Sequence, residues 1–73
     1  DDLKMIIEFN PAALQNGSVP PLEFVVSLAS SGWSIQIIEE TNGLSPLTDG
    51  DAPALVNRLL SDGTSVHFFC TRQ

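Results

Sequence analysis

The sequence predicts an α/β fold made of three strands and two main helices. Three short apolar runs, at 3–9, 33–40 and 64–71, have the composition of strands, whereas 20–31 and 52–62 carry apolar residues at helical spacing. Strands and helices therefore alternate along the chain, which is the pattern of α/β domains. We expect one small domain over residues 1–73, which at this size buries only about 60% of its unfolded surface.

The first strand, Leu3 to Phe9, is the element around which the others are expected to pack. Its apolar run is nearly continuous, which is typical of a strand covered on both faces, and Pro11 marks its end. Ligands of open α/β sheets bind beyond the carboxyl ends of the strands. Glu8 and Asn10 lie at that end of this strand, so they are the first candidates for a binding site.

A loop at 10–17, compatible with a helical turn at 11–14, leads to the first main helix at 20–31. Ser18 is the expected N-cap of that helix, and Gly32 is its expected left-handed C-cap. The buried face follows the i, i+3, i+4, i+7 spacing of Leu22, Val25, Val26 and Ala29, and it is widened by Phe24 and Leu28. The second strand follows at 33–40, and Asn42-Gly43 predicts a turn behind it.

The stretch 44–48 is ambiguous and is compatible with a short extended segment whose Leu44 and Leu47 reach the edge of the core. The second main helix comes next. Asp51 is its expected N-cap, Pro53 is in its first turn, and Gly63 ends it.

The composition excludes two classes of partner. The formal net charge is −6, and the basic residues Lys4, Arg58 and Arg72 are scattered, so neither nucleic acids nor anionic membranes are expected to bind. The lone Cys70 cannot form an internal disulfide, which favours a reducing compartment and an expected cytoplasmic location. Met5 is either a native start or an internal residue of a longer chain.

No complete catalytic motif is present. In the final strand, Cys70 shares a face with Val66 and Phe68, whereas His67 and Phe69 point the other way. These apolar residues on both faces predict an interior strand. His67 and Cys70 cannot share a metal ion, so no metal site is expected. Glu39-Glu40 is interpreted as a solvated strand end.

Glu8 allows two interpretations. A carboxylate between Ile7 and Phe9 is costly to bury, so it must lie at an exposed strand end or have a partner. In one interpretation it is an end-of-strand acid hydrogen-bonded to nearby backbone. In the other it faces a ligand crevice, on the same strand face as Lys4 and Asn10.

The order of the segments resembles a known enzyme family. Residues 6–14 read Ile-Ile-Glu-Phe-Asn-Pro-Ala-Ala-Leu, and Gly17 follows them. Next come the helix ending at Gly32, the strand from Trp33 and the segment 43–47. A Leu-rich helix and a strand ending Cys70-Thr71-Arg72 complete the chain. This resembles the C-terminal part of the FkbM family of S-adenosylmethionine-dependent methyltransferases. In that family a late strand has a similar Glu-Phe-x-Pro ending, and an apolar strand with a basic residue near its end closes the protein. The family's glycine-rich cofactor turn and its Asp-Val-Glu-Gly-x-Glu segment have no counterpart here.

The resemblance implies a topology as well as a function. It implies a three-stranded mixed sheet, as in the C-terminal part of a Rossmann-like methyltransferase, with the final strand between the other two and antiparallel to both. The helical connections alone would have predicted an all-parallel set. The chain would be the C-terminal segment of an enzyme that transfers a methyl group from S-adenosylmethionine to a hydroxyl of a sugar or natural product.

In such an enzyme Glu8 would be catalytic and Asn10 would bind the small-molecule acceptor. The cofactor would be S-adenosylmethionine for the parent enzyme and none for the isolated segment, which would be inactive. The edge strand at Met5 to Phe9, left without a neighbour, is expected to self-associate or to be covered by the termini. The alternative is a small acidic module that binds a protein partner and catalyses nothing.

Overall fold

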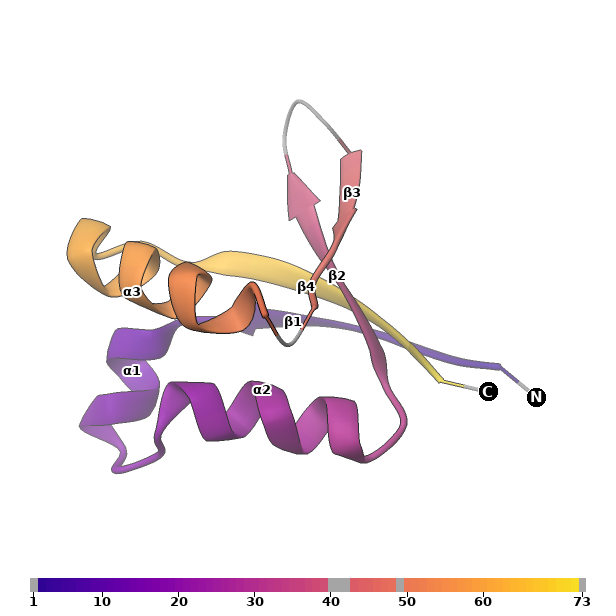
Figure 1. The fold of residues 1–73 in the computed structure, drawn as a ribbon, viewed down its shortest axis with the longest axis horizontal. Coiled ribbons are helices and arrows are strands. Elements are labelled where there is room, and N and C mark those ends of the chain that lie inside the picture. Colours follow the sequence, from indigo (N-terminus) through magenta and orange to yellow (C-terminus); the bar gives the residue numbers. More distant parts are fainter. Residues whose placement is uncertain (1, 40–42, 49, 73) are drawn as a thin grey trace.

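The computed structural model describes residues 2–39, 43–48 and 50–72. Within them the predicted α/β class is confirmed (Figure 1), and the elements in chain order are β1 (Leu3–Phe9), α1 (Pro11–Asn16), α2 (Pro21–Ser30), β2 (Ser34–Glu39), β3 (Gly43–Pro46), α3 (Ala52–Asp62) and β4 (Val66–Arg72). The expected strands and main helices begin and end within two residues of these bounds. The turn expected at 11–14 is a six-residue helix, α1. Glu40 and Asn42, at the expected end of the second strand, lie outside the described residues.

The sheet has the order β1-β4-β2-β3, and every neighbouring pair is antiparallel. The predicted place of the final strand, between the first and second strands and antiparallel to both, is therefore confirmed. The expected three-stranded mixed sheet is wrong, because a fourth strand, β3, pairs with β2 at the far edge. Figure 1 shows this β2–β3 pair extending away from the helices.

The helices cover one face of the sheet. Met5, Ile7 and Phe9 of β1 alternate with Lys4, Ile6 and Glu8, and only the first set packs into the core. We call the other side the outer face. It carries Ile6, which is 63% exposed. The expectation that β1 is covered on both faces is thus wrong, because Lys4, Ile6 and Glu8 are all exposed on the outer face.

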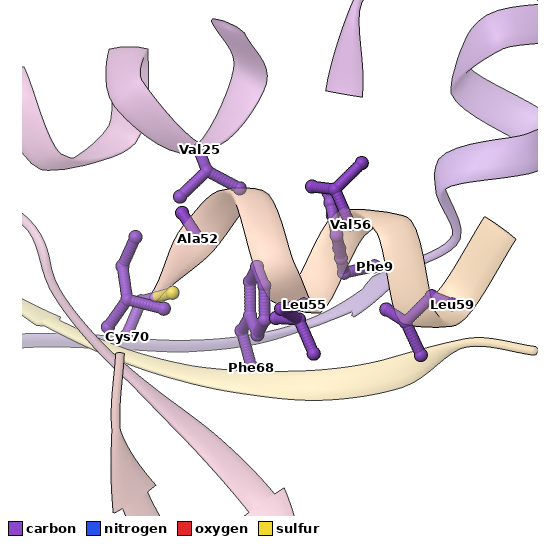
Figure 2. Close-up of a cluster of buried hydrophobic side chains, with 9 residues drawn as sticks. Phe9, Val25, Ala52, Leu55, Val56, Leu59, Phe68 and Cys70 are labelled. Atoms are coloured by element: carbon purple, nitrogen blue, oxygen red, sulfur yellow. The ribbon is translucent and has the colours of Figure 1, made fainter. Parts of the chain in front are cut away.

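The core lies between this inner face and the helices. Figure 2 shows β1 and β4 side chains facing the apolar stripe of α3, whose members are Ala52, Leu55, Val56 and Leu59. The rings of Phe9 and Phe68 stack with centroids 4.8 Å apart and planes at 17°. Both rings are fully buried. The pair joins β1 to β4 and anchors the sheet against α3.

The helix ends follow the sequence signals at their C-termini and less well at their N-termini. Gly32 after α2 and Gly63 after α3 have positive φ, as predicted, and the Trp33 and Thr64 N–H groups bond back into the last turns. Ser18 is not the N-cap of α2, because it adopts a positive φ and Pro20 holds the cap position.

The second N-cap prediction was right in position only. Asp51 does precede α3, and Pro53 does lie in its first turn, but the Asp51 carboxylate makes no cap bond. Instead it accepts a hydrogen bond of 2.8 Å from the Thr48 hydroxyl. In the preceding segment, Leu47 packs against the core as expected, whereas Leu44 is 47% exposed and does not reach it.

Candidate functional site

The carboxyl ends of β1 and β2 lie at the same end of the sheet, with the start of β4 between them. Both strands run antiparallel to β4, and Phe9 and Ile38 pair with its first residues, Val66 and His67. This is the sheet end at which ligands of open α/β sheets bind. The candidate site is therefore built from the last residues of β1 and β2 and the first of β4.

Glu8 is exposed on the outer face at this end, directly opposite His67 of β4. The Ser65 hydroxyl, just before β4, donates a hydrogen bond of 3.1 Å to Glu8 Oε2. The hydrogen-bond partner of Glu8 is thus a side chain 57 residues away in the sequence. The interpretation in which Glu8 bonds to nearby backbone predicted a different partner. The bond orients the carboxylate and leaves it open to solvent and to a ligand.

A hollow of about 350 Å³ borders Ser65 at the same end of the sheet. It is lined by Ile37, Ile38, Glu39, Arg58, Ser65, Val66 and His67. Arg58 comes from α3, so the hollow joins a guanidinium to an imidazole and a carboxylate. A guanidinium can bind an anionic or oxygen-rich ligand through several N–H donors. This hollow, beside the oriented Glu8, is the best-equipped place in the described chain for polar chemistry.

Sequence reasoning missed this cluster. Glu39 was interpreted as a solvated strand end, but its carboxylate accepts a hydrogen bond from Ser45 of β3. Arg58 and Ser65 carry no local signal, because an exposed arginine on a helix and a serine in a loop are common. Only the strand order brings α3, β2 and β4 together, and that order is not a property of any one segment.

Asn10 has a structural task that the sequence analysis did not assign to it. It is the N-cap of α1, and its Oδ1 accepts a hydrogen bond of 3.2 Å from the Ala13 N–H. Within the described residues no hydrogen bond joins the Asn10 and Glu8 side chains. Because its Oδ1 is used in the cap, only the side-chain N–H₂ group of Asn10 is left to bind a methyl acceptor.

The two metal-ligand residue types of β4 point apart, as predicted. Cys70 is fully buried in the core, whereas His67 is exposed on the outer face. Burial raises the pKa of the Cys70 thiol, so it stays protonated near neutral pH and is a poor nucleophile. Among residues 2–39, 43–48 and 50–72, no three His, Cys, Asp or Glu side chains are grouped to hold a metal ion.

A second hollow, of about 430 Å³, lies between α2, β2 and the segment after β3. Its lining includes Val25, Trp33, Gln36, Leu47 and Thr71. These side chains are apolar or neutral, so the hollow could hold a ligand but offers no acid or base for catalysis. The candidate site therefore remains at the Glu8 end of the sheet.

The comparisons with known proteins add no relative. No family model, curated protein or solved structure matches the chain. In the described part of the chain, each helix is too short or too polar to cross a membrane.

Proposed function

We propose that this chain is the C-terminal sheet segment of an S-adenosylmethionine-dependent methyltransferase that acts on a hydroxyl of a sugar or other natural product. The observation that carries the proposal is the position of β4. It lies reversed between β1 and β2, which run in the same direction. That is the arrangement the sequence resemblance implies, and the helical connections alone would not predict it.

The bare parts of the sheet also support the proposal. Within the described sheet, β1 has a neighbour on one side only, and its outer face carries the exposed Ile6. In a longer α/β enzyme, a preceding strand would pair with the free edge, and helices would cover the outer face. The segment would then contribute the acceptor side of the active site.

Glu8 is the residue we assign to the chemistry. Methyl transfer to a hydroxyl needs the acceptor oxygen held in line with the methyl group and its proton removed. An exposed carboxylate, oriented by Ser65 and located at the carboxyl end of β1, can accept that proton. Arg58 and His67, which line the adjacent hollow, can hold the polar groups of the acceptor.

These residues do not form a cofactor site. The turn from β1 into α1 is not glycine-rich; its Ala13 N–H is already bound by Asn10, and Pro11 has no N–H to offer. S-adenosylmethionine would therefore have to bind elsewhere in the parent enzyme, and Glu8, Arg58 and His67 would act on the acceptor only.

A second candidate function, a non-catalytic module that binds a protein, is favoured by the outer face. Ile6, Ile38 and Leu44 are exposed there, and Phe69 is half-buried between them. Exposed apolar patches of this kind mark interaction surfaces. Such a module would use the outer face directly and would need no preceding strand.

Calorimetric titration with S-adenosylmethionine separates the two candidates. The experiment compares the 73-residue chain with the longer protein encoded when the reading frame is followed upstream. We expect micromolar binding by the longer protein and no heat of binding from the 73 residues. Binding by the 73 residues alone, or none by a folded longer protein, would contradict the proposal.

A further inference from the structure

The two edges of the sheet differ in how well they are protected. β3 is four residues long and includes Pro46, which are features that discourage pairing with another chain. β1, at the other edge, has seven residues and no proline. Its groups on the side away from β4 have no neighbouring strand in the described sheet. β1 is therefore the edge at which another strand can add.

We propose that β1 pairs with β1 of a second copy of this chain, antiparallel and with the two-fold axis at Ile6. The two sheets would then join into one continuous sheet. This inference concerns the 73-residue chain and does not depend on the proposed function. It rests on the charge pattern of the strand, which is complementary to itself in this register.

The complementarity comes from Lys4 and Glu8. They lie on the same outer face of β1, two residues on either side of Ile6. Within one strand they are about 13 Å apart, which is too far for an ion pair. In the antiparallel pair centred on Ile6, Lys4 lies opposite Glu8 of the second copy, and Glu8 lies opposite its Lys4. Opposite charges at directly facing positions stabilise a strand pair.

No neighbouring register does the same. In an antiparallel pair, side chains that face each other must lie on the same face of the sheet. The two-fold axis must therefore pass through a residue of β1, and each alternative register moves the axis to another residue. An axis at Lys4 or at Glu8 places like charges opposite each other. An axis at Met5 places Glu8 opposite Asp2, and an axis at Ile7 leaves Glu8 opposite Ile6. Only the axis at Ile6 satisfies both charges and pairs all seven residues.

The apolar residues agree with this register. On the outer face, the two Ile6 side chains would meet at the axis, and each is 63% exposed in the single chain. On the inner face, the partly buried Met5 would lie opposite Ile7, and the half-exposed Leu3 would lie opposite Phe9, whose own ring is already buried. Each copy would thus cover apolar surface that the other leaves open.

Sedimentation equilibrium of charge variants tests the pairing. Because a single strand pair buries less than the ~1,200 Å² of a stable interface, we expect a weak dimer with a Kd on the order of 10 µM to 1 mM. Lys4→Glu and Glu8→Lys should each raise the Kd about tenfold, since the two-fold axis doubles every like-charge contact. The double variant Lys4→Glu/Glu8→Lys should return the Kd to within about threefold of the original.

Disulfide trapping tests the register. Ile6→Cys should form a cross-linked dimer on mild oxidation, because facing residues lie within the Cα distance that a disulfide spans. Lys4→Cys is the matched control. It lies on the same face but opposite Glu8 of the second copy, so the two introduced cysteines are far apart and should cross-link at least about tenfold more slowly. Circular dichroism confirms that every variant is folded. Failure of the double variant to restore the dimer, or equal cross-linking by the two cysteine variants, would overturn the proposal.

Discussion

Replacing Phe68 with alanine should remove most of the stability of the chain. Phe68 is fully buried and stacks on Phe9 between the sheet and α3. Truncating such a residue costs about 3–5 kcal/mol, because transfer free energy is lost and a cavity remains. A chain of 73 residues has about 4–11 kcal/mol to lose, and small domains lie near the low end. We expect the melting temperature to fall by more than about 12 °C in thermal denaturation followed by circular dichroism.

Phe69→Ala is the matched control. It removes the same ring one position along β4, but from the outer face, where Phe69 is half-buried and outside the core cluster. Its cost should be about 1 kcal/mol, or roughly a third or less of that of Phe68→Ala. Equal losses for the two variants would show that the outer face is covered in solution and would contradict the one-sided arrangement of helices.

Glu8→Gln should lower the turnover of the proposed parent methyltransferase at least about tenfold, which is less than a general base typically contributes. The substitution keeps the shape of the side chain and removes its ability to accept a proton. Thermal stability should barely change, because Glu8 is exposed and its hydrogen bond to Ser65 lies at the surface. The measurement is steady-state methyl transfer, with the melting temperature of each variant recorded alongside.

Ser65→Ala separates catalysis from scaffolding. It breaks the same 3.1 Å hydrogen bond but leaves the Glu8 carboxylate in place, so turnover should fall much less than in Glu8→Gln. If Glu8 is scaffold only, both variants should lower the melting temperature and leave turnover normal. That outcome would remove Glu8 from the site.

The elements with strong periodicity could be predicted from the sequence. The position of α3 was predicted from its apolar stripe, and the ends of α2 and α3 were predicted from the glycines that follow them. Helical spacing and a left-handed C-cap depend only on nearby residues, so the sequence is enough to locate them. β1 was predicted with its observed bounds, Leu3 to Phe9. The interior position of β4 was predicted from its apolar residues on both faces, and its antiparallel direction from the resemblance.

Four features could not be predicted from the sequence. β3 is four residues long and contains a proline, so it carries too little alternation to identify a strand. The coverage of the sheet could not be predicted because Ile6 and Phe69 make an open face look like a buried one. The Arg58–His67–Glu39 hollow depends on strand order, and the capping role of Asn10 depends on where α1 begins.

The central claim is that β1 is the open edge of the sheet, because both the methyltransferase proposal and the dimer depend on it. Hydrogen–deuterium exchange read by mass spectrometry tests this directly, in the 73-residue chain diluted at least about tenfold below the dimer Kd. In an antiparallel pair, alternate residues direct their N–H groups to a given neighbour. About half of the amides in the 3–9 peptide should therefore exchange almost as fast as in the unfolded chain, while the 66–72 peptide, whose residues 67–71 are paired on both sides, stays protected. Uniform protection of the 3–9 peptide, equal to that of 66–72, would contradict the account.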